Sequence, residues 1–106
     1  MMTIDEMKLA VCEKLPETVY RHHGVWMWHS KANICYGPRE VHWPTEGLQV
    51  CHEAEKLLNA AQRTSYGGWL IDYTASKAGI EAWTHHAPYE QRLEALCRVW
   101  FPERFQ

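Results

Sequence analysis

The chain has 106 residues, with 11 lysines and arginines against 13 aspartates and glutamates, and a formal net charge of −2 at pH 7. This length predicts a single domain, residues 1–106, with one hydrophobic core. The near-neutral charge does not indicate a surface built for a polyanion. Apolar residues make up 46% of the sequence and include six tryptophans, which is typical of a folded chain rather than a disordered one.

Charged residues are spread through the N-terminal segment "MMTIDEMKLAVCEKL". Asp5, Glu6, Lys8, Glu13 and Lys14 interrupt any apolar run there, so the segment is neither a signal peptide nor a membrane span. We therefore expect a cytoplasmic protein that does not associate with a membrane. Without a secretory signal, the widely spaced cysteines are expected to be reduced, buried core residues rather than disulfides. They are Cys12, Cys35, Cys51 and Cys97.

The first predicted element is a helix over 4–15. Residues "TIDE" match the capping box, in which the Thr3 hydroxyl accepts from the backbone of Glu6 and the Glu6 carboxylate reaches back to Thr3. Apolar residues then recur at helical spacing. Pro16 ends the segment.

Two strands are predicted next, over about 19–29 and 33–42. The segment is rich in aromatic and β-branched residues and is interrupted by "SKAN" and "GP". In the first strand, Trp26 and Trp28 share one face, and the opposite face is also apolar. A sheet of this kind is expected to be covered on both faces.

The second half of the chain is predicted to be mainly helical. Thr45 can cap one helix. Asn59 and Gln62 form a second N-terminal signal, so a kink near Asn59 is expected to join this helix to a further one that carries Tyr66 and Trp69. The alternation in "GIEAWT" at 79–84 predicts a third short strand, with a loop as the alternative because the alternation covers few residues. The last helix begins at Pro88, ends at Pro102 and buries one stripe. The stripe consists of Leu93, Leu96, Cys97 and Trp100.

The predicted element order is therefore α-β-β-α-α-β-α. Because a short turn joins the first two strands, the sheet is expected to be antiparallel. We predict an α+β fold, a small antiparallel sheet of two or three strands with helices packed on both faces.

Two helical segments of the chain are "HEAEKLLNAAQRTSYGGWL" at 52–70 and "HHAPYEQRLEALCRVW" at 85–100. Through them the C-terminal two thirds of the chain resemble the phage ABA sandwich domain, a family of small phage and prophage proteins. The resemblance implies an α-β-α layering and a phage or prophage origin. The family has no established activity, so the resemblance implies no functional residue.

Histidines and cysteines raise the question of a metal or catalytic site. The sequence holds "CH" at 51–52 and "HH" at 22–23 and 85–86, but no C-x-x-C, C-x-x-H or H-x-x-x-H. "HEAEK" at 52–56 has lysine where the zincin helix needs its second histidine. A Cys-His pair formed in space stays open as an alternative, but no nucleophile motif surrounds any cysteine. We predict no metal, no cofactor and no catalytic residue.

The aromatic residues instead indicate binding. "VWMWH" at 25–29 carries more large apolar area than a small sheet needs, and tryptophan, tyrosine and methionine are enriched at protein interfaces. Packing in the core is the alternative, and it is favoured for each tryptophan taken individually. The expected partner-binding residues are Trp26, Trp28, Arg39 and Trp43. A homodimer through the same sheet is a further expectation.

Single-stranded nucleic acid is the alternative partner, because tryptophans can stack on bases and arginines can contact phosphates. The arginines are Arg21, Arg39, Arg63, Arg92, Arg98 and Arg104. Because the chain lacks a basic excess, we favour a protein partner from the host or the phage, in the cytoplasm of a bacterial host. An inhibitor of a host defence system such as CRISPR-Cas is one function of this kind.

Overall fold

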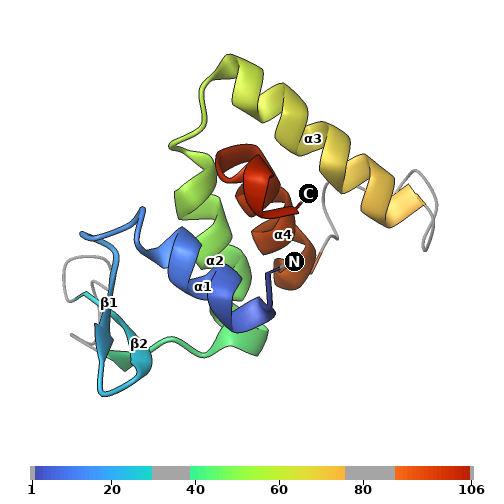
Figure 1. Ribbon diagram of the computed structural model, residues 1–106. Coiled ribbons are helices and arrows are strands. Elements are labelled where there is room, and N and C mark those ends of the chain that lie inside the picture. Colours follow the sequence, from blue (N-terminus) through green and yellow to red (C-terminus); the bar gives the residue numbers. More distant parts are fainter. Residues whose placement is uncertain (1, 30–38, 76–87, 106) are drawn as a thin grey trace.

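The computed structural model describes residues 2–29, 39–75 and 88–105 (Figure 1). The elements in these ranges are α1 (Ile4–Cys12), β1 (Val19–His22), β2 (Val25–Trp28), β3 (Arg39–Glu40), α2 (Trp43–Glu55), α3 (Ala60–Ala75), α4 (Tyr89–Trp100) and the 3-10 helix η2 (Pro102–Phe105). The protein is an α+β fold with a three-stranded antiparallel sheet in the order β1-β2-β3, which confirms the predicted class. The expected strand at 79–84 lies outside the described residues.

The N-terminal helix confirms its predicted capping box. The backbone N–H of Glu6 donates to the Thr3 hydroxyl at 3.2 Å, and the backbone N–H of Thr3 donates to the Glu6 carboxylate at 2.9 Å. α1 ends at Cys12 rather than at residue 15. The chain then tightens through i→i+3 hydrogen bonds from Lys14 and Leu15, a common way to satisfy the last carbonyls of a helix.

The single strand predicted over 19–29 is wrong, because this segment is a hairpin. β1 and β2 pair with Val19 opposite Trp28 and His22 opposite Val25. The two residues between them, His23 and Gly24, have φ angles of 50° and 82°. Two consecutive positive φ angles are the signature of the type I′ turn, whose twist matches that of the flanking strands.

β3 completes the sheet. Its residues Arg39 and Glu40 pair with Trp28 and Met27 of β2, and the Val41 N–H donates to the Trp26 carbonyl at 2.9 Å. The strand predicted over 33–42 is thus present at 39–40, and its residues 33–38 lie outside the described part of the chain.

The two faces of the sheet differ in their surroundings. Val19 and Trp28 are buried on one face, which lies against α1 and α2, whereas Val25 on the opposite face is exposed (Figure 1). The described helices therefore lie along one face, where the sequence led us to expect helices on both. Met27 on the opposite face is only half-buried, so this small sheet keeps an accessible side, as antiparallel sheets commonly do.

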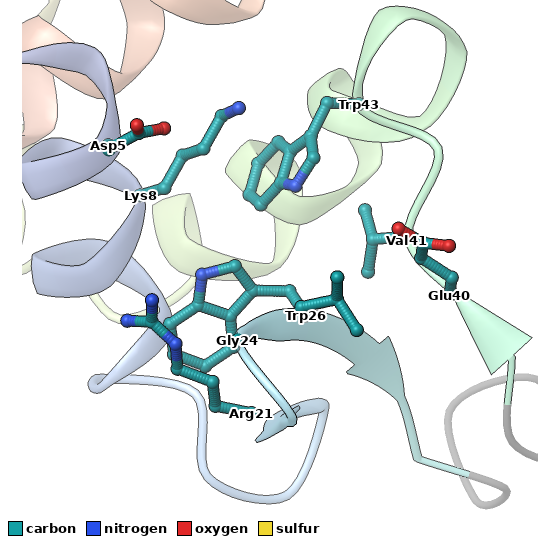
Figure 2. A pocket seen from close by; sticks show the side chains of 9 residues that line it. Asp5, Lys8, Arg21, Gly24, Trp26, Glu40, Val41 and Trp43 are labelled. Atoms are coloured by element: carbon teal, nitrogen blue, oxygen red, sulfur yellow. The ribbon is translucent and has the colours of Figure 1, made fainter.

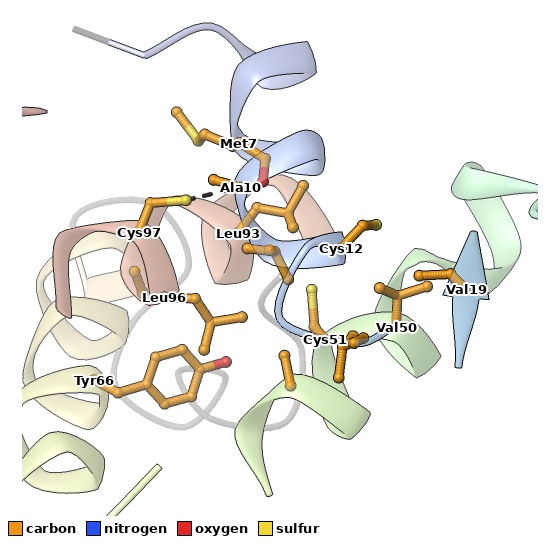
Figure 3. Packing of buried hydrophobic residues seen from close by; sticks show 14 of the residues in the cluster. Met7, Ala10, Cys12, Val19, Val50, Cys51, Tyr66, Leu93, Leu96 and Cys97 are labelled. Carbon is orange, nitrogen blue, oxygen red and sulfur yellow. Dashed lines mark hydrogen bonds between the residues drawn. The ribbon is translucent and has the colours of Figure 1, made fainter. Parts of the chain in front are cut away.

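α4 forms the centre of the helical region and contacts α1, α2 and α3 (Figure 1). Leu93, Leu96 and Cys97 have no exposed surface, as the predicted stripe required, and Trp100 is half-buried. Figure 3 shows the two leucines packed among side chains from the other helices. Each buried leucine contributes about 2 kcal/mol through removal of its apolar surface from water.

The start of α2 differs from the prediction, and the start of α3 agrees with it. α2 begins at Trp43, with His42 as its N-cap, so the predicted cap at Thr45 is wrong. The kink predicted near Asn59 is present as a break between the two helices. There the Asn59 backbone N–H donates to the Gln62 side chain at 2.9 Å, and the Gln62 backbone N–H donates to the Asn59 side chain at 2.8 Å. Similarly, Pro88 is the N-cap of α4 rather than its first helical residue.

Candidate binding groove

A groove lies where α1, the sheet and the first turn of α2 meet. It consists of two adjoining hollows of about 240 and 470 Å³, which share Lys8, Glu40, Val41 and Trp43 as lining residues. Trp26 and Arg21 line the smaller hollow, shown in Figure 2, and Tyr89 lines the larger. We call these two hollows the aromatic groove.

The three aromatic side chains of the groove come from three different elements. Trp26 lies on β2, while Trp43 and Tyr89 are the first residues of α2 and α4. Figure 2 shows the indoles of Trp26 and Trp43 on two sides of the smaller hollow, with Val41 beside them. All three aromatic residues are half-buried, so their rings remain accessible to a ligand.

Tyr89 reaches the groove because Gly47 leaves room for it. A Cβ atom at Gly47 would lie 2.5 Å from Cγ of Tyr89, a distance that real contacts do not allow. The tyrosine ring therefore packs on the surface of α2 at this glycine. There it stands 5.7 Å from the Trp43 ring, at an interplanar angle of 37°, within the range of favourable aromatic pairs.

Two cations lie on the rings of the groove. The Lys8 ammonium is 4.8 Å from the centroid of Trp43 and 5.9 Å from that of Tyr89, and the Arg21 guanidinium is 5.5 Å from Trp26. Such cation–π contacts contribute about 0.5–1 kcal/mol at exposed sites. Asp5 and Glu40 also line the smaller hollow, so the groove carries both signs of charge.

A polar network beneath the groove joins the sheet to α2. The Glu46 carboxylate accepts from the Arg39 guanidinium, from the Trp28 indole N–H at 3.3 Å and from the His42 backbone N–H at 2.8 Å. The hydrogen bond from Arg39 lowers the pKa of Glu46 to about 2, against an opposing effect of desolvation. The carboxylate also lies in the first turn of α2, where the helix dipole favours a negative charge.

The structure divides the four predicted partner-binding residues into two pairs. Trp26 and Trp43 line the groove. Trp28 is only 2% exposed and Arg39 is ion-paired with Glu46, and neither residue lines the two hollows. Their partner-binding role remains a prediction, and the placement favours Trp26 and Trp43 as the residues that a ligand would touch.

Sequence reasoning missed Lys8 and Tyr89. Lys8 occupies the polar side of an amphipathic helix and is not distinguished there from any solvated lysine. Tyr89 had a usable signal, namely a glycine at 47 inside a helical pattern, because an interior glycine often marks a close packing contact. Gly67 and Gly68 differ from Gly47, because a Cβ atom at either would meet no described atom within 4 Å beyond their own helix, and α3 continues through both.

A second polar cluster, at the other end of α2, is enclosed by helices. The Arg92 guanidinium donates to Glu55 at 2.9 Å and to the Tyr66 hydroxyl at 3.4 Å. Arg92 is 5% exposed, and the remaining carboxylate oxygen of Glu55 lies 2.7 Å from Nδ1 of His52. Burial and Glu55 raise the pKa of Tyr66. The cluster joins α2, α3 and α4, which is a structural role.

The described cysteines are free and buried, as predicted, while Cys35 lies outside the described residues. Burial raises the pKa of Cys12 and of Cys97 to about 12, and raises that of Cys51 as well. A thiol with a raised pKa is a poor nucleophile at neutral pH. Cys51 is directed at the Tyr89 carbonyl, and the adjacent His52 is exposed and pairs with Glu55, so these neighbours do not form a catalytic pair.

Two pairs of candidate histidines remain, and only the first pair is among the described residues. His22 and His23 are exposed at the hairpin, with ring centroids 4.1 Å apart, while His85 and His86 lie outside the described ranges. Within those ranges, no group of three or more histidine, cysteine, aspartate or glutamate residues could hold a metal ion. No helix of the described residues is long and apolar enough to span a membrane.

Comparison of the chain with family models, with curated proteins and with solved structures finds no match. The resemblance to the phage ABA sandwich domain therefore stays a prediction. Any functional conclusion must be drawn from the geometry of the groove itself.

Proposed function

We propose that this protein is a non-catalytic binding module whose partner is another protein, held in the aromatic groove. The observation that carries this proposal is the accessible set of Trp26, Trp43 and Tyr89 around two adjoining hollows. Large, rigid aromatic side chains gain much contact area at a small entropic cost, which is why they dominate protein interfaces. The Glu46 network joins the Trp28 indole of β2 to the His42 backbone, and so would fix the two segments that carry Trp26 and Trp43 before the partner binds.

The charges support a protein partner over nucleic acid. Four of the arginines offered for phosphate contacts are engaged with glutamates: Arg39 with Glu46, Arg92 with Glu55, Arg98 with Glu94 and Arg104 with Glu6. The groove itself adds Asp5 and Glu40, which would repel a chain of phosphates. Binding to a single strand that weakened steeply with salt would instead favour nucleic acid.

The phage resemblance supplies the setting of the proposal. In a phage or prophage, the partner would be a host or phage protein in the bacterial cytoplasm, and a component of a defence system such as CRISPR-Cas is one candidate. A homodimer through the exposed sheet face with Val25 is the competing arrangement. Light scattering after size-exclusion chromatography, at several protein concentrations, distinguishes a stable dimer from a monomer.

The test compares two tryptophans that differ in location and share their local chemistry. Trp43 and Trp100 are both half-buried and both carry a lysine ammonium over the ring, at 4.8 and 5.5 Å. Tagged wild-type protein, W43A and W100A are used to capture partners from a bacterial lysate after nuclease treatment. We expect a stoichiometric protein partner that W43A loses and W100A keeps. A partner that both variants keep would contradict the proposal, provided that both variants unfold cooperatively.

A further inference from the structure

Two of the described cations line the smaller hollow, whereas Lys14 and Arg63, which also lack an ion pair with a described carboxylate, lie outside it. Lys8 and Arg21 contact aromatic rings, and neither forms an ion pair with a described carboxylate. Arg39, Arg92, Arg98, Arg104 and Lys56 each do. Both lining cations therefore keep donors for a negative group brought by a ligand.

The Lys8 ammonium is held in position without such a group. It lies over both the Trp43 and the Tyr89 ring, at 4.8 and 5.9 Å from their centroids. Figure 2 shows its nitrogen directed toward Trp43 at the edge of the hollow. A cation fixed in this way loses little conformational freedom when a carboxylate binds, which favours affinity.

The space next to Lys8 suits a flat or branched apolar group. Trp26 and Trp43 flank the hollow, and Val41 lies beside them (Figure 2). An aromatic side chain inserted there would meet ring faces and an aliphatic side chain, a combination worth more than its buried area alone.

The acidic residues of the hollow limit the charge that the ligand can carry. Asp5 and Glu40 lie on the same hollow as Lys8 and Arg21, so the lining is balanced in formal charge. A single carboxylate can approach Lys8, whereas a series of negative charges would meet Glu40. Repulsion of this kind is an ordinary source of specificity.

We propose that the smaller hollow of the aromatic groove recognises a segment of the partner protein in which a single Asp or Glu adjoins an aromatic residue. The aromatic side chain lies between Trp26 and Trp43, the carboxylate pairs with Lys8, and Arg21 adds attraction from the far side of Trp26. This inference rests on the proposed function and names the chemistry of the partner.

The test uses two blocked dipeptides that differ only in charge, acetyl-Trp-Glu-amide and acetyl-Trp-Gln-amide. Each is titrated into ¹⁵N-labelled protein, and the indole N–H signals of Trp26 and Trp43 are followed by NMR. We expect the Glu peptide to bind about five- to tenfold more tightly, as a charge-assisted hydrogen bond provides. Equal affinities, or tighter binding of a Trp-Lys peptide, would overturn the proposal.

Substitutions then test which residues of the hollow cause the preference for the Glu peptide over the Gln peptide. Lys8→Gln should reduce the Glu over Gln preference to about twofold or less, because the direct ionic partner is gone. Lys14→Gln is the matched control, since Lys14 also lies over aromatic rings but outside the groove, and it should keep the full preference. Glu40→Gln should tighten binding of the Glu peptide. A preference unchanged in Lys8→Gln would overturn the assignment.

Two further outcomes distinguish failure of this inference from failure of the proposed function. Oligothymidylate that shifts the same indole signals more strongly than the Glu peptide would overturn the proposed chemistry in favour of phosphate. Equal affinities for the two peptides, together with a protein partner that W43A loses, would refute only the carboxylate preference. The proposed function would then stand on its own test.

Discussion

The two ends of α2 carry the same kind of ion pair in different surroundings. At the first turn, Glu46 pairs with Arg39 of the sheet, and the Arg39 side chain is 42% exposed. At the last turn, Glu55 pairs with Arg92 of α4, whose side chain is 7% exposed. The first pair supports an accessible groove, whereas the second lies in the helical core.

This difference in exposure assigns ligand binding to the sheet end of α2 and stability to its helical end. The sheet end of the molecule holds half-buried aromatic residues, and Lys8 and Arg21 line its hollow, so a ligand can reach it. The helical end holds side chains with no exposed surface, such as Leu93 and Leu96. Substitutions at the helical end should therefore reduce the free energy of unfolding, and substitutions at the sheet end should mainly change binding.

The largest expected effect is at the helical end. Leu93→Ala should lower the free energy of unfolding by about 2–5 kcal/mol, because it removes transfer free energy and leaves a cavity. Leu57 is the control, since it is 52% exposed and its replacement by alanine should cost about 0.5 kcal/mol or less. Urea unfolding followed by circular dichroism measures both. Similar losses for the two variants would contradict the position of the core.

The two arginines provide a direct test of the comparison. Arg92→Gln leaves Glu55 and Tyr66 without their buried partner, and should cost about 3 kcal/mol. Arg39→Gln removes an accessible pair whose carboxylate keeps the His42 and Trp28 donors, and should cost about 1 kcal/mol. Urea midpoints with unchanged slopes give the two values. The reverse ranking would show that the sheet end carries the stability.

Gly47→Ala tests the contact that brings Tyr89 to the groove. The new methyl group would meet the Tyr89 ring, and overpacking of this kind costs about 1–3 kcal/mol, partly offset by the better helix propensity of alanine. Gly67→Ala in α3 is the control, because open space surrounds it within the described residues, and it should stabilise by about 0.5–1 kcal/mol. Thermal unfolding reports both. Adding Tyr89→Ala to the Gly47 variant should relieve the clash.

These positions also show what the sequence could predict. The capping box at Thr3, the break at Asn59 and the buried stripe with Leu93 were predicted because each depends on residues within one or two turns of a helix. The hairpin was missed because a type I′ turn is usually announced by Asn-Gly or Asp-Gly, and this chain uses His23 and Gly24.

The candidate site was predicted only in part, for a related reason. Trp26 and Trp43 stood out by residue type alone. Lys8 and Tyr89 enter the groove through contacts between distant elements, which no local pattern encodes. Trp28 was named as a partner-binding candidate because tryptophan is common at interfaces, whereas its indole N–H donates to Glu46 and its ring is part of the core, the alternative that residue type alone could not separate.

Acidification should weaken the sheet end through Glu46. Its pKa is lowered in the folded protein from an ordinary 4.5 to about 2, so the stabilisation is fully present above about pH 4.5 and is lost as the pH falls toward 2. We expect a contribution of about 1–2 kcal/mol, after allowance for solvent screening. The free energy of unfolding is measured against pH for wild-type protein and E46Q. Their difference should shrink on acidification, and a constant difference would contradict the assignment to Glu46.

The smallest expected effect on stability is at Lys8, and it matters because of its contrast with binding. Lys8→Gln and Lys14→Gln each remove cation–π contacts at half-exposed rings, so each should lower the free energy of unfolding by about 0.5 kcal/mol. Equal small losses, measured by urea unfolding, mean that any difference between the variants in peptide binding reports recognition rather than folding. A loss of several kcal/mol in Lys8→Gln alone would place the groove within the stabilising core, and the division between the two ends of α2 would fail.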